Sequence, residues 1–581
     1  HSSQQDLKLP DNRAELFHDL IDLLLTRWAE RPRRTETGLV AGAGETLGEL
    51  LQDPGVAGFE LDHLLQLVAE LAHDHYRGGR ERSLILIPAE TLRRRLVEQH
   101  HDPDTALGAA WAERVMTFIQ FRAGLLNSPD GGENYDFPHS LLGEYLAAYH
   151  LARQRRSSEV VTNKVTADGN WDEIVRLAAG HHIFVRKETR DALDLAEELC
   201  QAAKDKPAET VTDLEWRRVA LAGDILHEMG QQRLERERRQ GPACRELLRG
   251  LLQCLLVHGA LPARDRARAG VVLGHLGDPR PCVGLKHGMP NIDWIEIPPG
   301  PFKMGSQEGE GSSDERPQFD CDVITQPFAI SRYPVTVAQY QAFVDAGGYG
   351  EKQFWTDAGW EWRQSDKVSG PEDNEPVYQT PNHPRAGVSW FEALAFCRWL
   401  AERTKLNVTL PSEAEWERAA RHTDGRAYPW GDEEQGIEQR CNMDKTGLGH
   451  TSAVGIFPTG LAKCGAADMA GNVWEWTRSL WGKDYKREFP YPYSIDGKRE
   501  DLDAARNVAR VLRGGSWDVS AGSARCASRS SGSFPTTGTG ASGFGWWRPH
   551  SLLRTLIPLN SEALTHCSLG GSGAKPPTFF C

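Results

Sequence analysis

A run of short motifs rich in tryptophan, glycine and charged residues extends over residues 294–544. In order, the motifs read WIEIPPGPFKMGS, FAISRYPVTVAQYQAFV, HPRAGVSWFEALAFCRWL, LPSEAEWERAAR, YPWGD, DMAGNVWEWT and VLRGGSW. Apolar and polar residues alternate along residues 294–304, which are rich in Ile, Pro and Phe. This pattern predicts a strand that opens a sheet. Residues 336–346 and 390–402 have helical apolar spacing. The run therefore predicts a domain that combines helices and strands.

Two serines mark expected helix starts within this run. Ser389 directly precedes residues 390–402 and can cap that helix. Ser412 lies three residues before Glu415, which is the spacing of a capping box. This structural role is sufficient, so we assign no catalytic role to Glu413 or Glu415. The inward faces of the two earlier helices are expected to carry Tyr340, Phe343, Phe391, Ala395 and Trp399.

Read together, the motifs resemble the formylglycine-generating-enzyme-like branch of the C-type lectin fold. The resemblance covers residues 289–545 and implies an α+β domain over residues 285–545, with a variable region at about 513–545. In the resembled family, the scaffold serves oxidative catalysis in some members and hypervariable ligand binding in others. The fold alone therefore does not decide the function. The last motif, VLRGGSW, and the residues after it have to decide it.

Formylglycine-generating enzymes carry a copper-binding cysteine pair just after the RGGS motif. The first cysteine lies two residues past the aromatic residue that follows RGGS, and the second lies five residues later. Here the RGGSW motif is intact, but Val519 stands at the first position, and Cys526 matches a downstream, non-catalytic family cysteine. A soft copper site needs paired thiolates.

The related sulfoxide synthases use an HxxxHxE pattern that the histidines of the amino-terminal half do not form. The resemblance therefore implies no copper, and we expect the chain not to be an enzyme.

Residues 515–543 contain eight Ser, six Gly, four Ala and three Thr, with no Asn, Lys or Glu. This composition resembles the variable region of diversity-generating retroelement proteins, in which asparagine codons are randomised at adenine. The resulting codons encode Asp, Val, Ser, Gly, Ala, Thr and Phe, among others, but never Lys, Glu or Trp. The resemblance implies a ligand-binding surface that consists of Trp517, Asp518, Val519, Ser520, Gly522, Ser523, Ser530, Ser531, Ser533, Phe534, Thr536, Thr537, Thr539, Gly540 and Ser542.

The chemistry of this segment is that of a recognition surface. Ser, Gly and Thr cost little to order and offer adaptable hydrogen bonds, and an aromatic residue such as Phe534 can anchor a ligand. The alternative is a flexible low-complexity tail. The tryptophans and phenylalanines in and after the segment argue against that alternative.

The DMAGNVWEW motif corresponds to a loop that can hold Ca²⁺ in the resembled family. Calcium prefers several oxygen ligands, both carboxylates and backbone carbonyls. A second family site would begin at Asn442 and Met443, but its remaining ligands have no match downstream. The alternative is a tight turn whose tryptophans belong to the core. The ligands implied for the first site are the side chains of Asp468 and Glu475 and the carbonyls of Gly471 and Val473.

The amino-terminal half has a different pattern. Residues 12–30 and 61–76 have helical apolar spacing. Next comes a short segment of β-strand character at residues 83–88. A helix–hairpin–helix pattern over residues 114–152 follows it, as in a winged-helix domain. The phrase RAGLL…FPHSLLGEYLAAYHLA resembles the end of the helical region that follows the nucleotide-binding core of NACHT-type (STAND) ATPases, here over residues 12–185. The alternative is a helical spacer unrelated to ATPases. In the first helix, the expected apolar stripe is Leu16, Leu20, Leu23, Leu24 and Trp28.

The remaining segments carry fewer signals. No GxxxxGK[ST] loop occurs, so we expect neither nucleotide binding nor ATP hydrolysis by this chain. Residues 186–284 read as a helical connector, residues 1–11 as a tag remnant or linker, and residues 546–581 as a tail without a family template. The net charge of −14 argues against a nucleic-acid partner. No stretch has the apolar length of a membrane helix.

These observations predict a cytoplasmic, non-enzymatic receptor. Its macromolecular ligand is unidentified, and we expect it to be a protein. The odd number of scattered cysteines in an acidic chain fits a reducing compartment. Neither nucleic acid nor a membrane is expected as a partner, and Ca²⁺ is the one cofactor that we expect. Two alternatives remain: a metal-dependent oxidase of the formylglycine-generating type, and a STAND-type sensor with one fixed ligand.

Overall fold

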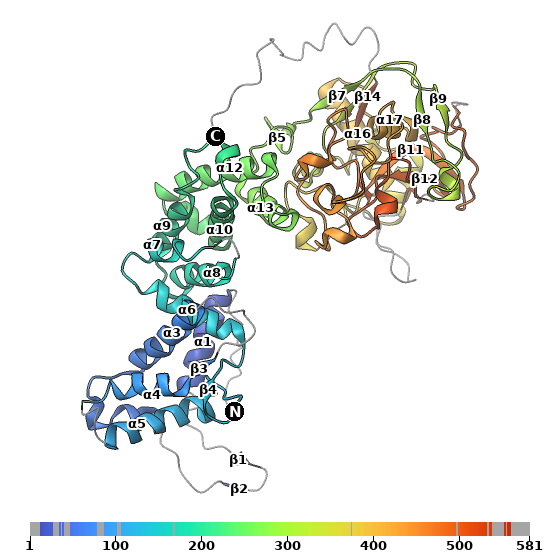
Figure 1. The fold of residues 1–581 in the computed structure, drawn as a ribbon. Helices are drawn as coiled ribbons and strands as arrows, with labels where there is room; N and C mark the ends of the chain where they lie inside the picture. Colours follow the sequence, from blue (N-terminus) through green and yellow to red (C-terminus); the bar gives the residue numbers. More distant parts are fainter. Residues whose placement is uncertain are drawn as a thin grey trace. The chain divides into compact units, whose positions relative to one another are not determined.

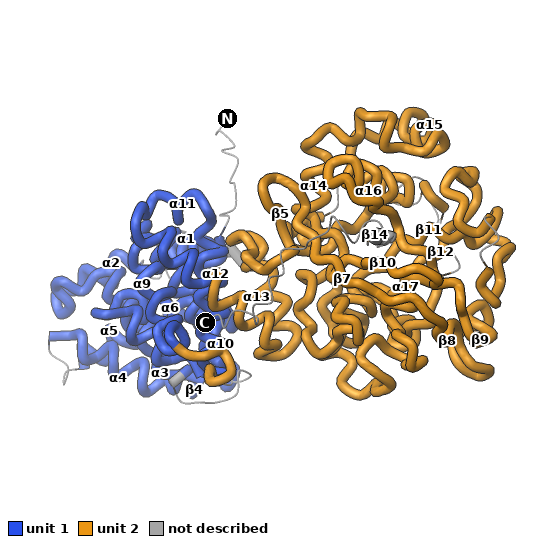
Figure 2. The backbone as a smooth tube through the Cα atoms, turned by 90° about the horizontal axis from the view of Figure 1, so that it is seen from above, with its two compact units in different colours: residues 1–205, 212–248 blue, residues 206–211, 249–581 orange. Residues whose placement is uncertain are grey.

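The computed structural model describes residues 12–26, 34–35, 38–39, 47–77, 86–101, 106–166, 169–372, 375–494, 498–530, 534–536, 551–552 and 555–558. The chain divides into two compact units (Figure 2). The first comprises residues 1–205 and 212–248, and the second comprises residues 206–211 and 249–581. The first unit is mainly helical, whereas the second combines helices with small sheets (Figure 1).

The first unit is built from helices and short strand pairs. Its α-helices are α1 (Arg13–Thr26), α2 (Leu47–Leu51), α3 (Leu61–Arg77), α4 (Ala89–Val97), α5 (Ala106–Thr117), α6 (Ser140–Ala152), α7 (Ser157–Thr162), α8 (Asp172–Gly180), α9 (Thr189–Cys200), α10 (Asp213–Met229) and α11 (Gln231–Arg236). Two π-helical segments, η2 (Phe118–Arg122) and η3 (His181–Val185), follow α5 and α8. The strands are β1 (Arg34–Thr35), β2 (Gly38–Leu39), β3 (Ile87–Pro88) and β4 (Asn134–Tyr135).

The helix–strand order predicted for the winged-helix region is present. β3 pairs with β4 in antiparallel register, and Ile87 lies opposite Tyr135. This pairing joins the two ends of the segment that contains α4 and α5. Helix α6 begins after His139, whose side chain accepts a hydrogen bond from the amide of Leu141. The hairpin and the following helix therefore occur where the sequence predicted them.

The buried face of α1 differs from the predicted leucine stripe. Leu16 and Leu20 are 36% and 37% exposed, whereas Ala14, Ile21 and Leu25 are buried. Large apolar residues occur on more than one side of this helix, so their spacing alone does not select the face that packs. The predicted stripe is wrong for Leu16 and Leu20, and Trp28 lies outside the described residues.

The second unit contains the predicted α+β domain. Helix α12 (Gln240–His258) crosses the division between the units. The later helices are α13 (Ala263–Leu276), α14 (Val337–Asp345), α15 (Asp357–Ser365), α16 (Trp390–Thr404) and α17 (Glu413–Arg421). The strands are β5 (Leu285–Lys286), β6 (Met289–Pro290), β7 (Trp294–Ile297), β8 (Phe302–Met304), β9 (Phe319–Cys321), β10 (Phe328–Ser331), β11 (Trp474–Lys483), β12 (Val508–Arg513), β13 (Ser551–Leu552) and β14 (Leu556–Pro558).

Two three-stranded sheets have orders β14-β10-β7 and β12-β11-β13, and β8 pairs with β9. β14 runs antiparallel to β10, and β13 runs parallel to β11. Residues 551–552 and 556–558 thus add a strand to each sheet. The tail beyond residue 545, for which the sequence offered no template, contributes to the framework of the domain.

Three capping boxes start the main helices of this unit. They pair Thr336 with Gln339 before α14, Ser389 with Glu392 before α16, and Ser412 with Glu415 before α17. The caps predicted at Ser389 and Ser412 are confirmed. The side chains predicted to face inward are buried, namely Tyr340, Phe343, Phe391, Ala395 and Trp399.

Helix α13, which lies in the predicted connector, packs within the second unit. The guanidinium of Arg266 donates to the carbonyl of Ile456 at 2.8 Å, and the side-chain amide of Asn382 donates to the carbonyl of Gly270 at 2.9 Å. The compact unit thus starts well before the first motif of the domain. Among the described helices, none is both long and apolar enough to cross a bilayer.

Candidate functional site

The segment after β12 makes a tight turn before it reaches the predicted ligand surface. Gly514 and Gly515 have φ angles of 98° and 78°, a region that disfavours other residues. A Cβ atom on Gly515 would lie 2.8 Å from the carbonyl oxygen of Ser523, because the chain folds back on itself here. The turn leads into a short 3₁₀ helix, η11 (Ala521–Ala524).

Side chains between residues 517 and 524 separate into outward and inward sets. Asp518, Ser520 and Gly522 are exposed, whereas Ala521 and Ala524 are buried. The two alanines belong to an apolar cluster with Tyr428, Ile437, Cys441, Met443 and Ala470. Small residues therefore hold the segment on the domain and leave Asp518, Ser520 and Gly522 facing solvent. Trp517, Val519 and Ser523 are half-buried between these extremes.

A buried group of charges fixes this segment to α17. We call Glu413, Glu417, Arg513 and Arg529 the buried ion cluster, and the side chains of all four are 0% exposed. Arg513 pairs with Glu417, and Arg529 donates to Glu413 at 3.0 Å. Burial opposes the charge on Arg513, but the Glu417 carboxylate outweighs it and raises the pKa of this guanidinium.

Arg513 also orders the chain that follows the surface. Its guanidinium donates to the carbonyls of Cys526 and Ala527 at 2.8 and 3.0 Å. The buried ion cluster thus fixes both ends of the segment from Gly514 to Ala527. Sequence reasoning missed this role, although Glu413 and Glu417 lie four apart, on one face of a helix, in a chain whose last motifs are rich in arginine.

The later predicted surface residues lie in a different environment. Phe534 is half-buried, packs against Trp481, Ala509 and Val511, and contacts Tyr485 in a tilted ring pair with centroids 4.2 Å apart. Ser530 donates its amide to the carbonyl of Leu512 at 3.1 Å, and Thr536 is half-buried. The other predicted positions, Ser531, Ser533, Thr537, Thr539, Gly540 and Ser542, lie outside the described residues.

The positions of the expected copper cysteines are apolar. Val519 is half-buried, and Ala524, five residues later, is 1% exposed. Cys526 is completely buried, and burial raises the pKa of its thiol to about 12. A protonated, enclosed thiol is a poor metal ligand. These residues do not fit the copper site of a formylglycine-generating enzyme.

The loop for which the sequence predicted Ca²⁺ is a tight turn. Asp468 and Gly471 both have positive φ angles, 54° and 70°. A carboxylate oxygen of Asp468 accepts the amide of Gly455 at 2.7 Å, and one of Glu475 accepts the indole N–H of Trp416 at 2.7 Å. The Gly471 carbonyl accepts from the amide of Val473 at 2.8 Å. Carboxylates and carbonyls are the donor types that Ca²⁺ requires.

The second predicted calcium position adjoins this loop. Asn442 pairs with Gly471 in a parallel bridge. The side-chain oxygen of Asn442 is buried and accepts no hydrogen bond, and the carbonyl of Met443 accepts from the amide of Thr446 at 3.0 Å. An unsatisfied buried oxygen is unusual and fits a cation ligand.

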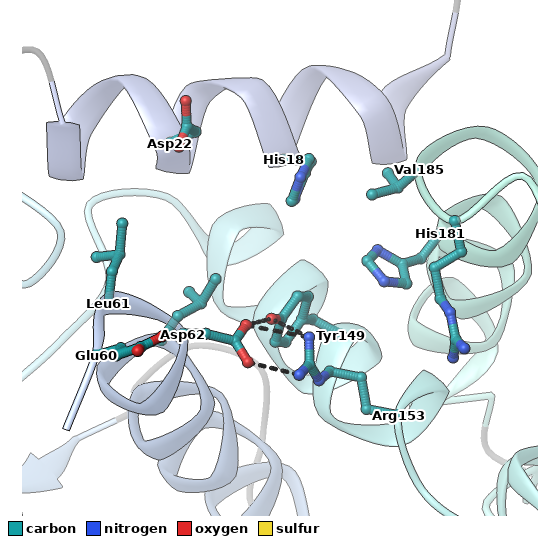
Figure 3. Close-up of a pocket in the computed structure, with 11 residues that line it drawn as sticks. His18, Asp22, Glu60, Leu61, Asp62, Tyr149, Arg153, His181 and Val185 are labelled. Atoms are coloured by element: carbon teal, nitrogen blue, oxygen red, sulfur yellow. Dashed lines mark hydrogen bonds and ion pairs between the residues drawn. The ribbon is translucent and has the colours of Figure 1, made fainter. Parts of the chain in front are cut away.

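A cavity of 720 Å³ lies in the first unit and is lined by residues of α1, α3, α6 and η3 (Figure 3). Its central carboxylate, Asp62, accepts hydrogen bonds from the hydroxyl of Tyr149 at 2.8 Å and the guanidinium of Arg153 at 2.6 Å. Burial lowers the pKa of His181, at the rim, to about 3. The Asp62 carboxylate is therefore already satisfied by hydrogen bonds within the protein.

Comparison with known proteins identifies the two halves. Residues 286–545 match the family model of the sulfatase-modifying factor enzyme 1-like domain, and residues 13–151 match the winged helix-turn-helix domain C-terminal to NACHT. The formylglycine-generating enzyme of Thermomonospora curvata is 31% identical over 266 residues, which are 38% of this chain and 82% of that protein. The chain belongs to the sulfatase-modifying factor enzyme 1-like family.

Other proteins similar to this sulfatase-modifying factor-like chain include a second class of enzyme and a solved structure. The hercynine oxygenase of Mycolicibacterium thermoresistibile is 34% identical over 238 residues, which are 38% of this chain and 51% of that protein. The chain spans about half the length of the hercynine oxygenases that it matches. The structure of Treponema denticola variable protein 1 is similar with a TM-score of 0.32 and 18% identity, over 46% of this chain and 95% of that one.

These relatives correct one prediction from the sequence. We expected the chain not to be an enzyme because it lacks the copper cysteines and a phosphate-binding loop. The curated relatives at 31–34% identity include formylglycine-generating enzymes and hercynine oxygenases. The prediction that the chain is not an enzyme is wrong. The lack of one known metal site does not exclude activity in a family that contains several enzymes.

The two glycines of the surface segment provide a direct test of the geometry. We expect Gly515→Ala to destabilise the second unit by about 1–3 kcal/mol, since it combines a positive φ with a clash against Ser523. Gly522→Ala is the matched control, because its Cβ would meet only the Ser520 hydroxyl oxygen at 3.9 Å. Urea unfolding of both variants measures the difference. Equal stabilities would contradict the described turn.

Proposed function

We propose that the carboxy-terminal domain is the ligand-binding part of a cytoplasmic receptor and that its ligand is a protein. The contact surface in this proposal is the segment that begins at Trp517, and a retroelement diversifies it. The observation that carries the proposal is the separation of residues 517–524 into exposed positions and small buried anchors. Such a segment can change its outward side chains without changing the fold.

The described contacts support tolerance at the outward positions. A Cβ at Gly522 meets no atom closer than 3.9 Å, so that residue 522 can carry a larger side chain. Ser520 and Asp518 are exposed as well. Half-buried Trp517 can supply an apolar contact beside these positions, because aromatic residues bury much area at low entropic cost. A protein surface is the ligand that this mixture of small polar residues and one tryptophan suits.

The amino-terminal unit supports a signalling role for the chain. Its matching family is defined by its position after a NACHT module. In our proposal, ligand binding at the carboxy-terminal domain is passed to such a module through the winged-helix region. This places recognition and response in different parts of one receptor.

A second candidate function is metal-dependent oxidation of the bound ligand. It is favoured by the identity to the formylglycine-generating enzyme of T. curvata over most of that protein. Because Val519 and Ala524 occupy the copper positions, this activity would need other ligands. Both candidates begin with ligand binding, and they differ in whether the ligand leaves chemically changed.

We also propose that Ca²⁺ binds the loop of Asp468, Gly471, Val473 and Glu475, with a second ion near Asn442 and Met443. The bound ion would hold the loop that precedes β11. Two positive-φ residues and a buried, unsatisfied amide oxygen are the observations that favour it. Its role would be structural, since these side chains are 8% exposed or less at Asp468, Glu475 and Asn442.

Calcium is expected to raise the melting temperature of the full chain after treatment with a chelator, because a ligand that binds only the folded state stabilises it. At a hundredfold excess over its dissociation constant, the gain is about 2.7 kcal/mol. Asp468→Asn keeps an acceptor for the Gly455 amide but removes the charge, so it should reduce this gain. Asp432→Asn, at an exposed position, is the control. An unchanged melting temperature in the parent protein would remove the proposal.

Diversification predicts a specific pattern of natural variation. We expect genes from many isolates to differ at codons 518, 520 and 522, whereas those for Gly515 and Arg513 stay constant. A nearby repeat that differs only at adenines, beside a reverse-transcriptase gene, should accompany the variation. Sequencing the 3′ end of the gene and its flank provides the measurement. An invariant surface without such a repeat would favour a sensor with one fixed ligand.

Binding is tested by a photo-crosslinking amino acid at Ser520 of the full chain, with the same group at exposed Gln364 on α15 as a control. We expect discrete protein adducts in cells from position 520 only. Mass spectrometry of the captured partner then separates the candidates: an unchanged partner supports a receptor, and an oxidised residue supports catalysis. Identical adducts from both positions would show that the surface is not the binding site.

A further inference from the structure

The turn between η3 and α9 in the first unit brings together three side chains that can bind a metal. His182, Glu188 and Asp191 each offer one ligand atom, and these atoms lie within 4.8 Å of one another. The group is far along the chain from the proposed ligand surface and involves none of its residues. A role for this group is therefore independent of the proposed function.

His182 is the decisive member because its ring is buried and incompletely satisfied. The residue is 1% exposed, and its Nδ1 atom makes no hydrogen bond. The nearest partner of Nδ1 is a carboxylate oxygen of Asp191 at 3.5 Å, while Nε2 lies 3.4 Å from the hydroxyl of Ser157. Metal-binding histidines commonly engage a polar partner through the second nitrogen.

The backbone holds the three residues in place. The amide of Glu188 donates to the carbonyl of His182 at 2.8 Å, and the amide of Asp191 donates to the carbonyl of Glu188 at 3.2 Å. The π-helical form of η3 precedes this turn, and such segments are frequent at functional sites. The two carboxylates thus approach the imidazole through local hydrogen bonds rather than through flexible side chains alone.

The two carboxylates lie close together, and a cationic side chain already contacts one of them. Arg186 offsets part of the charge, because its guanidinium pairs with one oxygen of Glu188 at 2.7 Å. The same guanidinium also donates to the carbonyl of Ala152 at 3.2 Å. Arg186 thus contacts Glu188, while the three candidate ligand atoms of His182, Glu188 and Asp191 lie within 4.8 Å of one another.

We propose that His182, Glu188 and Asp191 bind a divalent transition-metal cation, zinc above all. One imidazole nitrogen and two carboxylate oxygens suit zinc, which accepts both donor types and often keeps a fourth position for water. The imidazole disfavours calcium and magnesium, which prefer oxygen ligands. The ion joins His182, the second residue of η3, to the start of α9 and stabilises the turn between them.

Zinc titration of the full, chelator-treated chain tests this site. We expect zinc to raise the melting temperature by about 2–4 °C, and cobalt to give the visible absorption of a four-coordinate site. Glu188→Gln and Asp191→Asn should each raise the dissociation constant for zinc at least about tenfold. Both side chains are partly exposed, so these variants are expected to fold, unlike a change at buried His182.

Two further variants make the result specific. Glu198→Gln removes an exposed carboxylate two turns further along the same helix and should leave zinc binding unchanged. Arg186→Gln releases the paired oxygen of Glu188 and should tighten binding. If zinc gives neither a shift nor a cobalt spectrum, or if the response is the same in Glu188→Gln, Asp191→Asn and Glu198→Gln, the proposed site is wrong.

Discussion

Four fully buried charges connect α17 to the end of β12 and to the segment beyond it. Glu413 and Glu417 on the helix face Arg513 and Arg529, and no side chain of the four is exposed. Taking a charge out of water costs several kcal/mol, and only close pairing with full hydrogen bonding offsets that cost. Removing one partner of such a pair typically costs about 3–5 kcal/mol. The path of residues 514–530 over the domain depends on this cluster.

The arrangement explains how side chains of this segment can differ while the framework stays the same. The buried ion cluster and the apolar contacts of Ala521 and Ala524 hold the segment from within. Its outward positions are then free to carry recognition residues, and two positions, Val519 and Ala524, correspond to metal ligands in formylglycine-generating enzymes. A change of a few side chains on an unchanged scaffold thus alters the chemistry without altering the fold.

The features that were predicted well depend on residues close together in the sequence. Ser412 and Glu415 satisfy each other three residues apart, and the cap at Ser389 is equally local. The leucine stripe of α1 failed because an apolar residue can lie on any side of a helix that has several packing partners. Spacing shows that a helix is amphipathic, whereas the neighbouring elements decide which side is covered.

The sequence by itself determined the order of the motifs, the helix caps, the winged-helix pattern and the composition of residues 515–543, since each is a property of neighbouring residues. Only the tertiary structure decided which of those residues face solvent. Arg513 and Glu417 are 96 residues apart, and Arg529 and Glu413 are 116 apart. The strands at 551–552 and 556–558 likewise pair with β11 and β10. Such contacts form only when the whole domain has folded, because a charge or a strand edge specifies the type of partner it needs but not where in the chain that partner lies.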